Sequence, residues 1–250
     1  MDFKNKPIFG MIHLSGGDSE TILNRALKEI MILMDEGVDG IIIENYHGDT
    51  ESVIEVLKFT QGFGFSKRGM YVGINILPND FELALKLADE YGADFIQLDY
   101  VSGQYKPDIK IDGEKYIKAV TTKSNIKILG GVWPKYYRPV DGSNLEDDIE
   151  EALIMCDAIV VTGAGTGKET PLDKIKLFRE VMDKGTRGVD GRKTPLIIGA
   201  GLDASNVVEQ LQYADGAIVG SCFKPYKRTQ EMISKELVKE FMDEVKRLRK

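Results

Sequence analysis

Three side chains that could carry acid–base chemistry follow short apolar runs of the sequence directly. Glu44, Asp99 and His13 each come immediately after such a run. An ionised carboxylate at the inner end of an apolar strand is costly unless it is paired or used. Glu44 and Asp99 are therefore candidates for a general base and acid, or for ligands of a divalent metal ion. The alternatives are structural pairing with Lys127 or Lys135, and for His13 a structural role, which is common for a lone histidine.

A lysine stands in a comparable place after the fifth apolar run. Lys135 could assist proton transfer together with His13, and a Schiff base on Lys135 or Lys127 is a further option. The sequence has no Ser-His-Asp arrangement and no cysteine nucleophile pattern, so covalent acyl chemistry is disfavoured. Cys156 and Cys222 lack metal-site or disulfide spacing and are expected to be small buried hydrophobic residues.

Two glycine turns follow the last two apolar runs. The first is Gly199-Ala200-Gly201, which leads into a short helix predicted to begin near Asp203, and the second is Gly220-Ser221. Glycines let backbone N–H groups approach an anion, and a helix N-terminus adds favourable partial charge. The alternative is that these glycines only permit tight turns. We predict that Gly199, Gly201, Gly220 and Ser221 bind the phosphate of a small phosphorylated ligand.

A third glycine-rich segment, residues 162–169, reads TGAGTGKE. It fails the P-loop pattern, because Thr162 stands where glycine is needed and Glu169 where Ser or Thr is needed. Its glycines also recur at every second position, unlike the dinucleotide fingerprint. A flexible loop that closes over a ligand fits better, with Gly163 and Lys168 near the phosphate. A solvated lysine on an exposed loop is the alternative for Lys168.

These candidates need a scaffold that brings the ends of several apolar runs together. The sequence has eight such runs, at residues 8–12, 40–43, 71–76, 95–98, 126–129, 158–161, 196–198 and 217–219. Each is short and mostly β-branched, as in parallel strands buried on both faces. Amphipathic helical segments lie between them. This alternation over residues 1–250 predicts one α/β domain, a single (β/α)8 TIM barrel, whose functional face lies at the carboxyl ends of the strands.

Local signals place the predicted helices. Apolar residues four and three positions apart give the first helix one face, formed by Leu23, Leu27, Ile30 and Met34. The phrases at residues 37–39 and 92–94 read Gly-Val-Asp and Gly-Ala-Asp, where a glycine can end one helix before the next strand begins. Thr170-Pro171 is typical of a helix start with a capping hydroxyl. The longest strand-to-helix loops are predicted at residues 100–112 and 133–144.

Composition excludes several classes of function. The net charge of −7 argues against a nucleic-acid partner and gives no help to binding an anionic membrane surface. No apolar run approaches the ~20 residues of a membrane span. The N-terminus has no signal-peptide pattern, so we expect a cytoplasmic protein. A homo-oligomer is an open option, because no interface can be recognised in the sequence.

Several phrases together resemble the BtpA/SgcQ family of barrels. They are FGMIHL at residues 9–14, GVDGIIIEN at 37–45, GINIL at 73–77, GADFI at 92–96, VTG with TGKE at 161–169, and ADGAIVG with FK at 214–224. They span nearly the whole chain in order. The resemblance implies a (β/α)8 barrel of the phosphate-binding kind. Some members are associated with photosystem I biogenesis and others with sugar-utilisation operons, and no family reaction carries over.

The sequence also departs from the family pattern on the predicted functional face. Gly131 and Tyr136 stand where the family usually has an acid and a histidine, and Asp99 replaces a typical Asn. Two functions are therefore weighed. One is an isomerase, lyase or hydrolase acting on a small phosphorylated metabolite, a sugar phosphate or nucleotide. The other is a non-catalytic metabolite-binding or assembly-factor barrel, which the altered end of the fifth strand favours.

Overall fold

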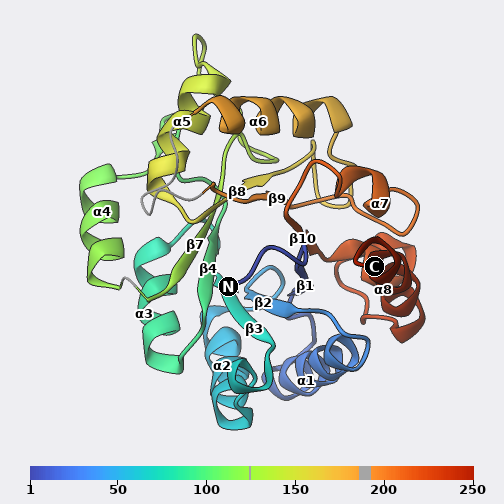
Figure 1. Ribbon diagram of the computed structural model, residues 1–250. Coiled ribbons are helices and arrows are strands. Elements are labelled where there is room, and N and C mark those ends of the chain that lie inside the picture. Colours follow the sequence, from blue (N-terminus) through green and yellow to red (C-terminus); the bar gives the residue numbers. More distant parts are fainter. Residues whose placement is uncertain (124, 186–192) are drawn as a thin grey trace.

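Eight parallel strands close into a barrel in the computed structural model, which describes residues 1–123, 125–185 and 193–250 (Figure 1). Around the barrel the strands follow sequence order, and the last pairs with the first. They are β1 (Ile8–Ile12), β2 (Gly40–Glu44), β3 (Tyr71–Asn75), β4 (Phe95–Leu98), β7 (Lys127–Gly131), β8 (Ala158–Val161), β9 (Leu196–Ile198) and β10 (Gly216–Val219). The predicted (β/α)8 barrel is confirmed.

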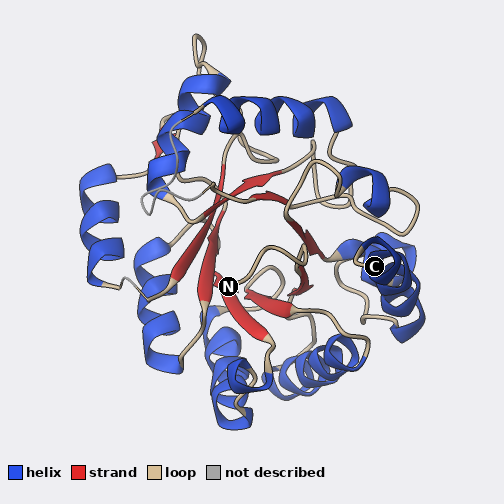
Figure 2. Cartoon of the chain, in the orientation of Figure 1, coloured by secondary structure: helices blue, strands red, loops and turns tan. Residues whose placement is uncertain are grey.

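The helices form a ring outside the strands, so that each strand leads outward to a helix and back (Figure 2). They are α1 (Ser19–Asp35), α2 (Thr50–Phe63), α3 (Phe81–Tyr91), α4 (Gly113–Thr122), α5 (Leu145–Met155), α6 (Leu172–Lys184), α7 (Val207–Gln210) and α8 (Lys235–Leu248). None of the helices in the described ranges is long and apolar enough to cross a membrane.

Two apolar cores stabilise the barrel. The larger lies between strands and helices, and the smaller fills the barrel interior with Phe9, Met11, Ile42, Phe95, Leu129, Ala158, Val160, Ile197 and Ile218. A Cβ on Gly73 would lie 2.2 Å from the Phe95 ring, so this glycine makes room for the ring inside the barrel. Met1 and Phe3 pack against the same interior core and cover its amino-terminal end.

An aspartate directly before every second barrel strand accepts a backbone hydrogen bond from the strand that precedes it in the barrel. The Asp39 carboxylate accepts the N–H of Ile8 at 2.8 Å, at the foot of β1. The same contact recurs from Asp94 to Val72, from Asp157 to Ile128 and from Asp215 to Leu196. The acids of the two Gly-x-Asp phrases, Asp39 and Asp94, thus do more than follow a helix end. Like Asp157 and Asp215, they accept N–H groups in the first two residues of a neighbouring strand.

Two of the expected helix details were only partly right. On α1, Ile30 is buried as predicted, and Leu23 and Met34 pack against the core. The buried face of α1 is centred on Ala26, Ile30 and Leu33, and it also carries the buried Glu29. Burial of Glu29 is possible because Arg25 lies 3.1 Å from its carboxylate, a pairing that an apolar periodicity does not reveal. Helix α6 begins as expected, but the Thr170 hydroxyl does not cap it. It donates instead to the carbonyl of Ala200, at 2.9 Å.

The two long loops after β4 and β7 pack on each other. The first contains a small antiparallel hairpin, β5 (Gln104–Tyr105) with β6 (Ile109–Lys110). A bridge from Tyr105 to Pro139 joins it to the second loop. The buried Tyr105 hydroxyl also accepts the N–H of Trp133 at 3.1 Å. The loops therefore support each other beside the barrel mouth.

Candidate functional site

The candidate site is the layer of inward-facing positions directly above the interior core. Because inward residues alternate along a strand, the positions two residues beyond the core side chains also point into the barrel. These positions are His13, Glu44, Gln97, Gly131, Thr162, Gly199 and Gly220, and on the same period Asn75 follows Gly73 and Asp99 follows Gln97. The layer is polar over β1 to β4 and glycine-rich over β7, β9 and β10. The two halves of the predicted site thus face each other across one barrel end.

A cavity that is partly open to solvent lies above this layer. Its floor is apolar, with Met11, Val160 and Ile218. Its lining includes eight of the ten predicted site residues, namely His13, Glu44, Asp99, Lys135, Gly199, Gly201, Gly220 and Ser221. Lys168 and Gly163 are not among the lining residues.

Glu44 is the most deeply placed acid of the cavity. Its side chain is 7% exposed and accepts a hydrogen bond from the Asn75 amide at 2.8 Å. Burial raises the pKa of Glu44 to about 7, with a smaller raising effect from Asp99, while Lys135 opposes the shift. The Glu44 carboxyl therefore exchanges its proton near neutral pH, as a general acid–base group requires.

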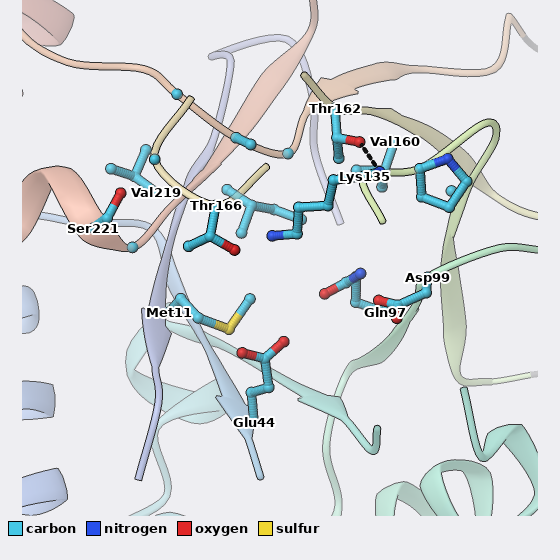
Figure 3. A pocket seen from close by; sticks show the side chains of 18 of the residues that line it. Met11, Glu44, Gln97, Asp99, Lys135, Val160, Thr162, Thr166, Val219 and Ser221 are labelled. Carbon is cyan, nitrogen blue, oxygen red and sulfur yellow. Dashed lines mark hydrogen bonds between the residues drawn. The ribbon is translucent and has the colours of Figure 1, made fainter. Parts of the chain in front are cut away.

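Lys135 faces the two acids from the opposite rim. Figure 3 shows its side chain reaching into the space shared with Glu44, Gln97 and Asp99. Its backbone N–H donates to the Thr162 hydroxyl at 2.8 Å, which fixes the start of the side chain. Within the described part of the chain its ammonium group makes no hydrogen bond or ion pair.

Lys127 does not contact either acid, so the expected structural pairing with it is wrong. Its ammonium group lies 2.7 Å from Asp157. The ion pairs between described residues also include none from Lys135 to Glu44 or Asp99 within 4.0 Å.

Asp99 lies beside Glu44 but is held by aromatic residues. The Tyr137 hydroxyl donates to it at 3.2 Å, and Tyr137 packs edge-on against Tyr100. Burial raises the pKa of Asp99, opposed by Lys135 and by the hydrogen bond from Tyr137. A Cβ on Gly131 would lie 1.8 Å from the Asp99 carbonyl oxygen, so no side chain fits at that position. The backbone that carries Asp99 fills the place where the resemblance implied an acid.

His13 is buried at the β1 side of the cavity, with 3% of its surface exposed. Its ring packs edge-on against Tyr46, and the Nδ1 atom has no hydrogen-bond partner. Burial lowers the pKa of His13 well below its usual value, and the nearby ammonium group of Lys224 lowers it further. The imidazole is therefore neutral at physiological pH. His47 is exposed and contacts the Thr229 hydroxyl at 2.9 Å.

Behind His13 lies a buried cation that the sequence pattern did not distinguish. Lys224 is 1% exposed, donates to the Thr229 carbonyl at 2.8 Å and lies 3.8 Å from Glu29. Burial lowers the pKa of Lys224 to about 8, while Glu29 opposes the shift. Arg25, Glu29 and Lys224 thus form a buried charged group between α1 and the end of β10.

The glycine turns line the cavity, but packing alone explains why they are glycines. A Cβ on Gly220 would lie 2.8 Å from the His13 ring, and one on Gly199 would lie 2.5 Å from Val160. Gly201 has a left-handed φ of 77° and lies against the backbone of Lys168. Any anion binding therefore depends on the N–H groups of these turns. The expected short helix is present, but it begins at Val207 instead of near Asp203 and has only four residues.

The loop at residues 162–169 closes one side of the cavity. Thr166 and Gly167 line it, and a Cβ on Gly167 would lie 3.0 Å from the Ser221 hydroxyl. The exposed Tyr136 hydroxyl accepts the N–H of Thr166 at 2.9 Å. Lys168 is exposed to solvent. The buried Gly163 lies below the Glu169 carbonyl, because its Cβ would come within 2.5 Å of that oxygen.

A second, partly buried lysine holds the ends of β7 and β8 together. Lys174 of α6 donates to the Trp133 carbonyl at 3.1 Å and to the Thr162 carbonyl at 2.9 Å. Burial lowers the pKa of Lys174. Since Thr162 in turn receives the N–H of Lys135, this contact supports the segment that carries the free ammonium group.

Gln97 is the site residue that sequence reasoning missed. It lines the cavity, and its carbonyl oxygen accepts from Asn75 at 2.9 Å. The available signal was its place as the sole polar residue of the run at 95–98. No group of three or more His, Cys, Asp or Glu side chains among the described residues is placed to hold a metal ion.

Comparisons with known proteins agree with this architecture. The BtpA family model matches residues 4–247. The chain is 31% identical to an uncharacterised protein of Methanocaldococcus jannaschii, over 99% of this chain and 98% of that protein. It is 30% identical to the photosystem I biogenesis protein BtpA of Synechocystis sp., over 96% of this chain and 88% of the relative. The structure of phosphoribosyl anthranilate isomerase from Thermus thermophilus is similar in fold, with a TM-score of 0.61, 12% identity and coverage of 97% and 99%.

Proposed function

The chain belongs to the BtpA family, and we propose that its barrel mouth binds a small phosphorylated metabolite and catalyses a proton-transfer step of the isomerase or lyase kind. The observation that carries the proposal is the pairing of groups in one cavity. A buried carboxyl with a pKa of about 7 and an unpaired ammonium group face the same space. Packing does not explain these two groups, because a partly buried charge without an ion-pair partner lowers the stability of the fold.

In the proposed reaction, Glu44 is the general base. Its carboxylate removes a proton from the carbon next to a carbonyl group, and the bonding electrons move onto the carbonyl oxygen. The Lys135 ammonium group donates a hydrogen bond to that oxygen and stabilises its negative charge. The Glu44 carboxyl then returns the proton to the neighbouring carbon, which gives an isomerisation. In this proposal Asp99 moves a proton between the two substrate oxygens.

The phosphate is assigned to the opposite rim of the cavity. The N–H group of Gly199 already donates to the Val161 carbonyl at 2.8 Å. The proposed phosphate donors are therefore the N–H groups of residues 200–201 and 220–221, and Gly167 lies against Ser221 from the loop above. The carboxyl ends of the last two barrel strands are a frequent phosphate position in this fold. A neighbour in fold is named for a phosphoribosyl substrate, which adds a parallel at the level of fold. Lys168 is exposed, so it has at most an outer role.

A thermal-shift and calorimetric screen tests the proposal. Inorganic phosphate, sugar phosphates and nucleotides are added to the full chain, with and without a divalent metal ion. A ligand at 100 times its dissociation constant stabilises the protein by about 2.7 kcal/mol. The proposal requires that at least one phosphorylated compound raises the melting temperature. If none does, the phosphate assignment is wrong.

The same screen separates catalysis from simple binding. Compounds that bind are incubated with the wild type and with Glu44→Gln, and substrate turnover is followed by exchange of carbon-bound hydrogen in heavy water. The proposal predicts exchange in the wild type and a loss of at least about 100-fold in Glu44→Gln. Binding without any exchange would identify the chain as a non-catalytic metabolite-binding barrel.

A further inference from the structure

We propose that the ligand of this cavity is a polyhydroxylated carbon chain with a single phosphate, an aldose or ketose monophosphate, and that Gln97 is a specificity-determining residue for it. The inference rests on the proposed phosphate rim and names what occupies the rest of the cavity. It separates this class from two others, the nucleotides and the phosphorylated carboxylic acids.

The first argument is the direction of the Gln97 amide. The Asn75 amide nitrogen donates to Glu44 and to the carbonyl oxygen of Gln97 at once, at 2.8 and 2.9 Å. This shared donor fixes the carbonyl end of Gln97 toward Asn75. The Gln97 NH₂ group is therefore left for the cavity, where it has no partner among the described residues.

The second argument is the alternation of donors and acceptors. The Gln97 NH₂ and Lys135 ammonium groups donate, whereas the carboxyl oxygens of Asp99 and Glu44 accept. The Thr166 hydroxyl, whose oxygen is buried without a partner, adds a group that does both. A hydroxyl group on a carbon chain is also both donor and acceptor, so adjacent hydroxyl groups can satisfy such a lining completely.

The third argument is charge. Two acids and one ammonium group line the part of the cavity away from the phosphate rim. A second phosphate or a carboxylate at that end of the ligand would add a full negative charge beside both acids in a partly buried place, and the single Lys135 ammonium group does not offset all of these charges. A neutral chain of hydroxyl groups meets no such repulsion.

The fourth argument concerns nucleobases. Binding sites for bases commonly offer a free aromatic face. Tyr46 is the one aromatic residue among those that line the cavity, and its ring is already engaged by the rings of His13 and His47 at centroid distances of 5.4 and 4.8 Å. A base therefore finds no stacking surface there.

Calorimetry with two matched pairs of probes tests the inference. Glycerol 3-phosphate is compared with 3-phosphoglycerate, and ribose 5-phosphate with 5-phosphoribonate. Within each pair the second compound carries a carboxylate in place of an uncharged end. Adenosine 5′-monophosphate and inorganic phosphate complete the set. We expect the uncharged-end compound of at least one pair to bind at least about tenfold more tightly than its acid and than the nucleotide.

Two variants connect the result to named residues. Gln97→Leu is expected to weaken binding of the preferred sugar phosphate at least about tenfold, with inorganic phosphate unchanged. Asp99→Asn is expected to reduce the discrimination against the acid of the same pair. Gln212→Leu, on an exposed glutamine away from the cavity, is the matched control and should change neither.

The outcomes distinguish failure of the ligand class from failure of the proposed function. Equal or tighter binding of the acid or the nucleotide would overturn the inference on ligand class and leave the phosphate rim intact. Retained sugar-phosphate affinity in Gln97→Leu would overturn the role of Gln97. If no compound binds, inorganic phosphate included, the proposed function itself is overturned.

Discussion

Replacing Glu44 with glutamine should make the protein more stable at alkaline pH. Glutamine has the same shape and can still accept the hydrogen bond from Asn75. The Glu44 pKa rises from 4.5 to about 7 on folding, chiefly because burial disfavours the charged form. At about 1.36 kcal/mol per pH unit, this interval corresponds to about 3 kcal/mol of stability.

The pH at which this effect emerges follows from the direction of the shift. Near pH 4 the carboxyl is protonated in both states, so wild type and Glu44→Gln should have similar stability. As the pH rises from 4.5 to 7 the unfolded state loses its proton first, and the wild type becomes progressively less stable. Above pH 8 the folded carboxyl is also ionised, and the advantage of the variant levels off at about 3 kcal/mol.

Urea unfolding of both proteins at pH 4.5, 6, 7 and 8 measures this difference. The matched control is Glu29→Gln, which removes a buried acid that is paired with Arg25 and Lys224. That variant should be less stable than wild type at pH 7, by about 3–5 kcal/mol, because it leaves buried cations without their partner. A stability difference between Glu44→Gln and wild type that is no larger at pH 8 than at pH 4.5 would refute the account of Glu44 as an unpaired buried acid.

Three further predictions concern the neighbours of this acid. Because folding lowers the pKa of His13, the wild type should lose stability as the pH falls below 6.5. His13→Gln should reduce this loss when the unfolding free energy is measured in urea at each pH. The same pH dependence in both proteins would contradict a neutral imidazole. Lys174→Met leaves two backbone carbonyls at the ends of β7 and β8 without their donor and should lower the unfolding free energy by about 1–3 kcal/mol, whereas an unchanged value in urea would show that water replaces the lysine. Gly201→Ala places a Cβ 2.2 Å from the Lys168 carbonyl oxygen at a left-handed φ, so it should lower the unfolding free energy by about 2–4 kcal/mol in thermal unfolding. Gly62→Ala, which has open space around its Cβ in α2, should not lower it.

Strand positions were the most predictable part of the fold. A parallel strand buried on both faces is an uninterrupted apolar run, so the eight runs and the polar residues that end them could be located directly. Since His13, Glu44 and Asp99 each follow one of these runs, the sequence also predicted that they lie at one barrel end. The helix details were less accessible, because the Thr170 hydroxyl binds the distant Ala200 carbonyl instead of its own helix.

The chemistry of the site depended on contacts between residues far apart in sequence. No local pattern predicts that Lys127 pairs with Asp157, or that Lys135 has no ion-pair partner among the described residues. The orientation of Gln97 is set by Asn75 from the neighbouring strand. Glycine turns were located correctly, but their immediate cause is packing against side chains and backbone brought near by barrel closure.

A crystal structure of the full chain with the tightest-binding sugar monophosphate is the most direct test of the central claim. The account predicts phosphate density within hydrogen-bond distance of the backbone N–H groups at residues 200–201 and 220–221. It also predicts that the carbon chain extends toward Lys135, Glu44 and Gln97. Phosphate density outside the barrel mouth, or a ligand whose carbon chain points away from these side chains into solvent, would contradict the account.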